Sequence, residues 1–296
     1  FFFQAEDGIR PRSPSRGLGD VYKRQVKGKG LLYDFLRRHK VPFKQIGKLI
    51  VSKKGEESSI VQILDNAIKN KVTDLQLLKR RQLKELEPAL SAENALHSPS
   101  TGILDSHRYM ETLLILAQKS GVIFAPRTQV EQVSVNSSQF NVTARVEQTS
   151  SHDPLFYEFS CDKFINSAGL GAQDLAHNIA GVHSNQIPLL HPCKGDYFSY
   201  SGKNPFKHLI YPIPEKNHTG LGIHSTSDMS NQLRFGPDTE YIDGFNYSVN
   251  ESKRELFASA IKSYFPEVES HRLIPAYSGI RPKLNGPGKE LSLIHI

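Results

Sequence analysis

The stretch FINSAGLGAQDLA, residues 164–176, decides the fold class of this chain. An apolar run typical of a β-strand leads into Ala168 and Gly169, and a helix is predicted from Gln173 to Ile179. A helix that begins there offers backbone N–H groups and the positive end of its dipole, and small residues let a nucleotide pyrophosphate or a flat ring approach the backbone. Any turn from a strand to a helix favours glycine, so this pattern alone leaves a purely structural role open.

Upstream of this stretch, helical periodicity gives way to strand-like periodicity. Helices are predicted at residues 30–40, 56–70, 74–88 and 106–120, with Asp105 or Ser106 as a cap of the last one and Gly121 as its end. Closely spaced β-rich runs then predict strands and a meander. These runs are VIFAP (122–126), TQVEQVSV (128–135), FNVTARVEQ (140–148), LFYEFS (155–160) and KFINSAG (163–169).

Downstream of the same stretch, strands alternate with long turns. The predicted strands are KGDYFSYS (194–201), HLIYPIP (208–214), GLGIHSTS (220–227) and QLRFGPD (232–238), followed by a helix over residues 251–264 and a closing strand. No segment repeats at a fixed period and no low-complexity linker separates the parts. The sequence therefore predicts an α/β fold in which the chain crosses between its domains.

The closing strand contains YSGIRPKL, residues 277–284, in which Arg281 stands between a glycine turn and a proline. Gly279 can approach another surface closely, and Pro282 holds the arginine in an extended conformation. An arginine held in this way presents a planar fork of donors that suits a carboxylate or a phosphate. A surface arginine at a turn is the alternative.

Three other polar side chains stand beside glycine or proline on predicted strands. His224 lies in GLGIHSTSD, and a neutral imidazole there can accept the proton of a substrate hydroxyl group during oxidation of a 2-hydroxy acid. Tyr211 in IYPIP and Lys194 in CKGDYF could each orient a carboxylate. Each residue taken alone is equally compatible with an ordinary structural or surface role.

The composition excludes several classes of protein. The net charge is +7, but basic residues are spread along the 296 residues and interleaved with acidic ones, so no nucleic-acid partner is predicted. The positive electrostatic field would equally attract a small dianionic substrate. No apolar run approaches the roughly 20 residues of a membrane span. Cys161 and Cys193 have neither disulfide-framework nor metal-ligand spacing, which predicts no metal and a reducing compartment, the cytoplasm or a eukaryotic mitochondrion. The patterns GxGxxG, GxxxxGK[ST], HExxH and GxSxG do not occur.

The two ends of the chain look unlike protein sequence. Residues 1–25 have no clear periodicity, and both this segment and the tail 291–296 resemble translated sequencing adapters. We therefore expect both segments to be non-native and the natural protein to extend further in both directions.

The order of the motifs resembles the FAD-dependent oxidoreductases of the D-amino-acid oxidase superfamily, within it most closely the L-2-hydroxyglutarate dehydrogenase/oxidase group. The matching segments cover roughly residues 26–290 and include FINSAGLGAQDLA, HLIYPIP, GLGIHSTSD, RFGPD and GIRPKL. The resemblance implies an α/β fold with an α+β substrate part, from a two-domain enzyme. It also implies that this chain is a fragment without the family's N-terminal GxGxxG βαβ unit and its C-terminal segment over the flavin.

The resemblance further implies roles for individual residues. His224 and Arg281 would face the substrate as catalytic residues, with Arg281 on the α-carboxylate, and Lys194 and Tyr211 would bind the substrate. FAD would lie against Val130, Ala168, Gly169 and Gly279. The implied reaction is oxidation of L-2-hydroxyglutarate to 2-oxoglutarate, with oxygen, a quinone or a carrier protein as the electron acceptor. An amine-oxidising or amino-acid-oxidising flavoenzyme, and a misassembled fragment with no activity, are the alternatives.

The same resemblance suggests how the chain divides. Residues 26–100 are expected to form the helical part of the substrate domain and its connections, and residues 101–185 the rest of the FAD domain with its meander. Residues 186–278 would form the substrate-domain sheet, and residues 279–290 would return to the FAD domain.

Overall fold

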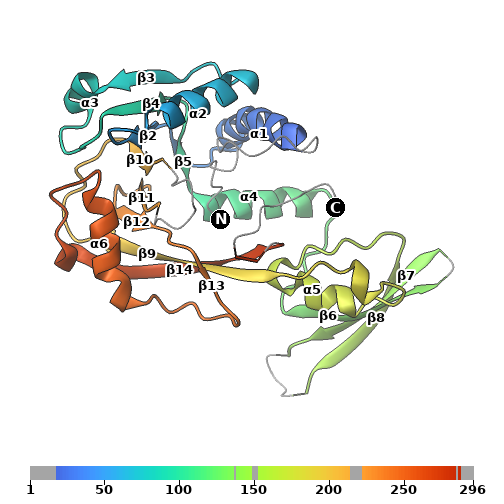
Figure 1. Cartoon of the computed structure of the whole chain (residues 1–296). Helices are drawn as coiled ribbons and strands as arrows, with labels where there is room; N and C mark the ends of the chain where they lie inside the picture. The colour runs from blue at the N-terminus through green and yellow to red at the C-terminus, as the bar shows by residue number, and fades with distance from the viewer. Residues whose placement is uncertain (1–17, 137, 149–152, 214–221, 285, 288–296) are drawn as a thin grey trace.

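The computed structural model describes residues 18–136, 138–148, 153–213, 222–284 and 286–287. Figure 1 shows a larger part, in which a long sheet is flanked by helices, and a smaller part made of α5 and the strands β6 to β8. The long strands β9 and β14 extend from the larger part towards the smaller one. This mixed architecture agrees with the α/β prediction.

Nine strands form the main sheet. They run in the order β13, β9, β12, β11, β10, β2, β4, β3, and β14 pairs with β9 on its other side. Their bounds are β2 Lys48–Ser52, β3 Gln76–Lys79, β4 Asn94–Ser98, β9 His191–Tyr200, β10 Leu209–Pro212, β11 His224–Ser227, β12 Leu233–Gly236, β13 Glu240–Tyr241 and β14 Leu273–Lys283. The pairing of β10 with β2 is parallel and the others are antiparallel.

The remaining elements connect and cover this sheet. The helices are α1 Leu18–His39, α2 Glu57–Lys69, α3 Arg80–Leu86, α4 Ser106–Lys119, α5 Ala172–His177 and α6 Arg254–Lys262. A separate antiparallel sheet contains β6 Thr128–Asn136, β7 Gln139–Val146 and β8 Leu155–Cys161, and β1 Phe43–Lys44 pairs with β5 Ile103–Leu104. No helix in the described ranges is both long enough and apolar enough to cross a bilayer.

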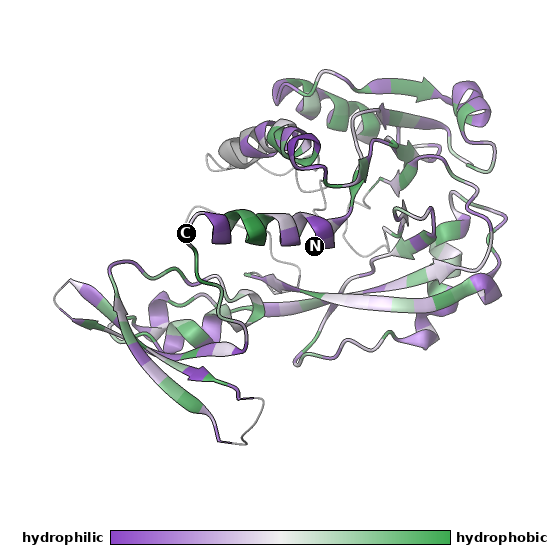
Figure 2. Ribbon diagram, turned by 180° about the vertical axis from the view of Figure 1, so that it is seen from behind, coloured by the Kyte–Doolittle hydropathy of each residue, from purple (hydrophilic) through white to green (hydrophobic). Residues whose placement is uncertain are grey.

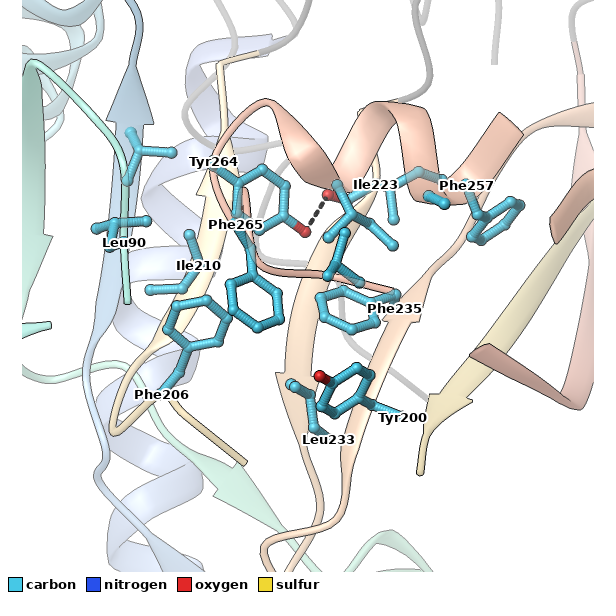
Figure 3. Packing of buried hydrophobic residues seen from close by; sticks show 14 of the residues in the cluster. Leu90, Tyr200, Phe206, Ile210, Ile223, Leu233, Phe235, Phe257, Tyr264 and Phe265 are labelled. Atoms are coloured by element: carbon cyan, nitrogen blue, oxygen red, sulfur yellow. Dashed lines mark hydrogen bonds between the residues drawn. The ribbon is translucent and has the colours of Figure 1, made fainter. Parts of the chain in front are cut away.

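The hydrophobic core lies between α6 and one face of the main sheet (Figure 3). Phe198 of β9 and Phe257 of α6 are fully buried, with ring centroids 4.7 Å apart. The hydroxyl group of buried Tyr264 donates a hydrogen bond of 3.0 Å to the Ile223 carbonyl. Burial of this many aromatic and aliphatic side chains fixes which face of each strand points towards α6.

Strand register divides the side chains of the main sheet between two faces. Because side chains alternate along a strand, Phe198, Phe235 and Ile210 point to the core, here called the α6 face. Tyr211, His224, Tyr197 and Arg281 then point to the opposite side, here called the site face.

Several predicted elements form at or near their predicted positions. The strands β6, β7, β8 and β9 to β12 each overlap a predicted strand, with ends that differ by up to four residues. The Asp105 carboxylate caps α4 by accepting a 2.9 Å hydrogen bond from the Arg108 N–H, and Gly121 follows the helix with a φ of 89°.

Other predictions differ from the structure. Residues 76–79 of the predicted helix 74–88 form β3, because they pair with β4 at the edge of the sheet. The predicted strands VIFAP and KFINSAG lie outside any strand or helix up to residue 168, and the described residues provide no strand to pair with them. Helix α1 begins at Leu18, inside the segment 1–25 in which no periodicity was expected, and α5 ends two residues earlier than predicted.

The predicted domain boundaries cross continuous elements. Residues 26–100 supply three strands of the main sheet as well as helices, and β14 continues through position 278 without a break. The division into domains and the non-native ends stay predictions. Residues 1–17 and 288–296 lie outside the described residues.

Candidate functional site

Arg281 lies on the site face of β14 above a pair of glycines. Gly195 of β9 pairs with Gly279 of β14, and Arg281 pairs with Cys193 one step further along. A Cβ atom at Gly195 would lie 3.2 Å from Arg281 Nη2 and 2.6 Å from the Pro237 Cβ. Gly195 therefore gives the guanidinium room to lie across β9, close to the backbone.

Gly279 leaves an open floor next to this guanidinium. A Cβ atom added to Gly279 would meet no atom of the described residues within 4 Å. A ligand above this glycine would have Arg281 on one side and Tyr277, two residues earlier on the same face, on the other. The space fits a carboxylate in reach of the arginine fork.

His224 and Tyr211 form a stacked pair on the same face. Their rings lie 4.0 Å apart between centroids, with an angle of 6° between the planes. They come from the neighbouring strands β11 and β10, and 6% of His224 is exposed. The structure thus brings together two of the residues predicted from the sequence, and the stack fixes the plane of the imidazole.

Gly236 of β12 separates His224 from the strand β9 that Arg281 crosses. Gly236 pairs with His224, and a Cβ atom there would be 2.8 Å from the ring of Tyr197 on β9. The absence of a side chain at Gly236 lets the Tyr197 ring lie over β12. Tyr197 therefore lies on the site face between the strand that carries His224 and the Arg281 guanidinium.

Lys194 does not join this group. It is adjacent to Gly195 on β9 and therefore points to the α6 face. Its Nζ donates to the Ser248 carbonyl and lies 3.3 Å from the Asp196 carboxylate. The structure places Lys194 in a buried ionic network, on the opposite side of the sheet from Arg281.

The same network contains a second lysine. Lys253 Nζ lies 2.6 Å from Asp238, 2.6 Å from Glu240 and 3.0 Å from Asp196. Burial alone would lower the pKa of Lys253, but its hydrogen bonds to Asp238, Glu240 and Asp196 raise that pKa above its ordinary value. The Asp196 N–H also donates a 2.7 Å bond to Asp238, so the network holds β9 directly beneath Arg281.

Sequence reasoning missed three residues of the site face. Buried Lys48 of β2 places its Nζ 4.8 Å from the centroid of the Tyr211 ring. Tyr277 stacks on Tyr197 at 4.6 Å, and Arg234 of β12 lies 5.8 Å from the Tyr277 ring. Burial raises the pKa of Tyr277 to about 12, although Arg234 acts in the opposite direction. Spacing could have found Tyr277, because it precedes Arg281 by four residues on a strand.

Three of the predicted cofactor-binding residues occupy a second region, while the fourth, Gly279, lies beside Arg281. Gly169 has a φ of 60°, which favours glycine, and no described atom lies within 4 Å of its missing Cβ. Ala168 precedes it, and the 3-10 turn Gly169–Gly171 contacts β14. Val130 lies on β6 at a bulge, half-buried and paired with Ala144. The turn and β14 thus present small backbone positions that fit a flat group lying against them.

This turn can hold only part of a dinucleotide. Helix α5 has six residues, and the pattern GxGxxG is absent from the sequence. The residues present therefore fit one wall of an FAD site rather than its pyrophosphate-binding loop. Among the described residues there is no cluster of histidine, cysteine and carboxylate side chains suited to a metal ion.

Comparison with curated proteins identifies relatives along most of the chain. It is 34% identical to the mitochondrial L-2-hydroxyglutarate dehydrogenase of Arabidopsis thaliana, over 88% of this chain and 61% of that protein. An L-2-hydroxyglutarate dehydrogenase of Indibacter alkaliphilus is 24% identical over 88% of this chain and 71% of that protein. The chain spans about three fifths of the length of the Arabidopsis thaliana and Bos taurus relatives, 61% and 63%.

Solved structures agree with the fold. L-α-glycerophosphate oxidase from Mycoplasma pneumoniae, with FAD bound, matches 94% of this chain and 71% of its own with a TM-score of 0.75 and 19% identity. Glycine oxidase from Geobacillus kaustophilus matches 94% of this chain and 70% of its own with a TM-score of 0.70 and 14% identity. The family described as FAD dependent oxidoreductase matches residues 9–295. This chain belongs to that FAD-dependent oxidoreductase family, of the D-amino-acid oxidase type.

Proposed function

We propose that this chain carries the substrate-binding part of an FAD-dependent enzyme that oxidises a 2-hydroxy acid, L-2-hydroxyglutarate, to 2-oxoglutarate. The observation that carries the proposal is the position of Arg281, which lies over Gly195 beside the open floor at Gly279 and on the same face as His224. The similarity to proteins named L-2-hydroxyglutarate dehydrogenase supports the choice of substrate.

In this proposal, Arg281 binds the α-carboxylate of the substrate through its two-pronged fork of donors. This contact fixes the orientation of the substrate above Gly279, so that its C2 carbon lies between the arginine and the imidazole. His224 accepts the proton of the C2 hydroxyl group, with its ring held by the stack on Tyr211. Positioning of the reacting atoms supplies much of the rate enhancement.

FAD is the cofactor of the family, and in the proposed enzyme it supplies the acceptor for the hydride from C2 when bound. Ala168, Gly169 and Gly279 would line it, because they leave open backbone positions on the turn and on β14. Val130 on β6 would contact its adenine end. Lys194 stays a weaker proposal as a substrate ligand, since it points to the α6 face.

The test compares this chain with a version extended at both ends to the length of its relatives. The absorbance of bound flavin at about 450 nm is recorded before and after anaerobic addition of L-2-hydroxyglutarate. We expect the extended protein to bind flavin and to lose this band with the substrate. Flavin that binds but is not reduced would contradict the substrate assignment, and absence of flavin from both versions would contradict the cofactor assignment.

Oxidation of an amine or amino acid is the second candidate. It is favoured by the fold similarity to glycine oxidase and to L-proline dehydrogenase from P. horikoshii, the latter with a TM-score of 0.72. An amino acid also offers a carboxylate to Arg281, so the same experiment with glycine and L-proline separates the two reactions. Reduction by an amino acid, and not by a hydroxy acid, would select this candidate.

The electron acceptor and the compartment complete the proposal. Oxygen, a quinone or a carrier protein can each reoxidise the flavin, and the rate of reoxidation with each one identifies the acceptor. The names of several relatives include the word mitochondrial, and Cys161 and Cys193 are free thiols. We therefore propose a reducing compartment, the mitochondrion in a eukaryotic source or the cytoplasm otherwise.

A further inference from the structure

A second arginine lies on the site face beyond the pair of tyrosines. Arg234 of β12 pairs with Ser199 and Thr226, which places its side chain on the same face as His224 and Arg281. Its guanidinium carbon lies 5.8 Å from the centroid of the Tyr277 ring, and that ring stacks on Tyr197. The tyrosine pair therefore separates two guanidinium groups along the sheet.

The spacing of the two cations follows from the register. The Arg281 guanidinium lies over Gly195, and Arg234 lies beside the ring of Tyr277, the partner of Tyr197. Gly195 and Tyr197 are two residues apart, about 7 Å along a strand. The open position at Gly279 lies at the Arg281 end of this interval, because Gly279 pairs with Gly195 and follows Tyr277 by two residues. The site face thus has one guanidinium on each side of the tyrosine pair, with the open position on the Arg281 side.

Arg234 keeps hydrogen-bonding capacity for a ligand. Its Nη2 donates a 2.8 Å bond to Asp228, and 27% of its side chain is exposed. A guanidinium has five N–H donors, and Asp228 is the only side-chain acceptor that the described residues give it. The carboxylate of a ligand can also bind the partly exposed Arg234 beside the Asp228 carboxylate, because a guanidinium presents donors in two directions.

We propose that Arg234 binds the distal carboxylate of a five-carbon dicarboxylate whose other carboxylate lies on Arg281. This inference rests on the proposed function and deepens it, because it names the residue that selects a dicarboxylate over a monocarboxylate. The two carboxylate carbons of an extended five-carbon acid are about 5 Å apart. Charge-assisted hydrogen bonds of about 2.8 Å at each end let such an acid span cations on the order of 10 Å apart.

The test measures the binding of two unreactive acids by isothermal titration calorimetry. Glutarate has both carboxylates, and pentanoate has the same five carbons with one carboxylate. We expect the unmodified chain to bind glutarate more tightly by roughly 10- to 100-fold, as a hydrogen-bonded charge pair allows. Arg234→Gln should remove this preference and leave pentanoate binding unchanged, while Arg234→Lys should restore part of it. Arg80→Gln, an exposed arginine paired with Glu93 at 2.9 Å, is the matched control.

Each outcome separates this inference from the proposed function. Equal weakening of both acids by Arg234→Gln would mean that the arginine only holds the turn at Asp228, which overturns the inference. In the extended enzyme, an unchanged KM for L-2-hydroxyglutarate in Arg234→Gln would overturn it as well, while the proposed function would stand. Loss of the preference for glutarate in a protein whose flavin no hydroxy acid reduces would support the inference and contradict the proposed function.

Discussion

Gly195 of β9 and Gly279 of β14 pair with each other, but substitution by alanine should affect stability differently at the two positions. Gly195→Ala places a Cβ atom 2.6 Å from Pro237 and 3.2 Å from Arg281, so overpacking should lower the free energy of unfolding by about 1–3 kcal/mol. Gly279→Ala meets no described atom within 4 Å, so stability should stay unchanged. Urea unfolding followed by circular dichroism measures both values.

Affinity should respond differently from stability in this pair. If a carboxylate lies over Gly279, the added methyl group of Gly279→Ala should weaken the binding of glutarate, although this variant unfolds like the unmodified chain. An unchanged affinity in Gly279→Ala would place the ligand elsewhere on the site face. Equal stability of both variants would contradict the close approach of Arg281 and Pro237 to Gly195.

Arg281 itself should account for much of the binding of a carboxylate. Arg281→Gln removes a charged hydrogen-bonding group and should weaken glutarate and pentanoate alike, by roughly 10- to 100-fold. Arg281→Lys keeps the charge without the planar fork, so its affinity for both acids should lie between that of the unmodified chain and that of Arg281→Gln. Titration calorimetry with Arg80→Gln as the control checks the order. A variant at Arg281 that loses only glutarate would exchange the roles assigned to the two arginines.

At the level of residues, the sequence could predict side chains but not which way they point. Arg281 and Tyr211 each precede a proline, His224 follows Gly222 by two residues, and the structure places all three on one face. Lys194 also precedes a glycine but lies on the α6 face, because a shift of one residue along a strand reverses the direction of the side chain. Arg234 was missed since its role depends on β14, a strand distant in sequence that pairs with the same β9.

At the level of elements, Lys253 joins the N-terminal end of α6 to the strands β9 and β13. It is 15% exposed and bridges three carboxylates, so Lys253→Met should lower the free energy of unfolding by about 3–5 kcal/mol, because buried Asp238 loses its cation and Asp196 keeps only Lys194. Exposed Lys262 of the same helix is the control, and Lys262→Met should change stability little. Equal effects of the two substitutions in urea unfolding would contradict the role of the network.

The same contact makes a prediction for alkaline pH. The pKa of Lys253 is raised in the folded protein, so its contribution is complete below the ordinary value of 10.5 and disappears as the pH rises through the raised value. The free energy of unfolding should therefore fall above about pH 10.5, and less steeply in Lys253→Met. Parallel curves for the two proteins would show that other groups cause the alkaline loss.

Helices and strands could be predicted where local contacts determine them. They could not be predicted where pairing with a strand distant in the sequence determines them. Asp105 and Gly121 bound α4 through local contacts, and the alternating pattern of β6 to β8 forms a sheet of neighbouring strands. The sequence pattern of residues 76–79 predicts a helix, but these residues pair with β4, and this pairing overrides their helix propensity. Conversely, VIFAP and KFINSAG have strand-like composition, yet a strand needs a neighbour for its ladder of hydrogen bonds.

At the scale of the whole molecule, these unpaired segments and helix α4 expose apolar side chains. Ile123 is 92% exposed and Ile165 is 81% exposed, and neither lies in a strand. Helix α4 has no buried residue, and Met110, Leu113 and Ile115 on it are exposed. Figure 2 shows hydrophobic residues along this helix in green. Apolar surface on this scale favours association, and extended segments with free backbone groups favour edge-to-edge pairing.

We therefore expect this chain to self-associate as its concentration rises. Sedimentation velocity should show larger species at higher concentration, and the double variant Ile123→Ser/Ile165→Ser should shift the distribution towards the monomer, because it removes the two most exposed large apolar side chains of the described residues. Leu256→Ser, on the outer side of α6 and 54% exposed, is the control and should leave association unchanged. A chain that stays monomeric at every concentration would show that these segments are covered in solution, and equal effects of the two variants would show that association depends on general hydrophobicity rather than on this surface.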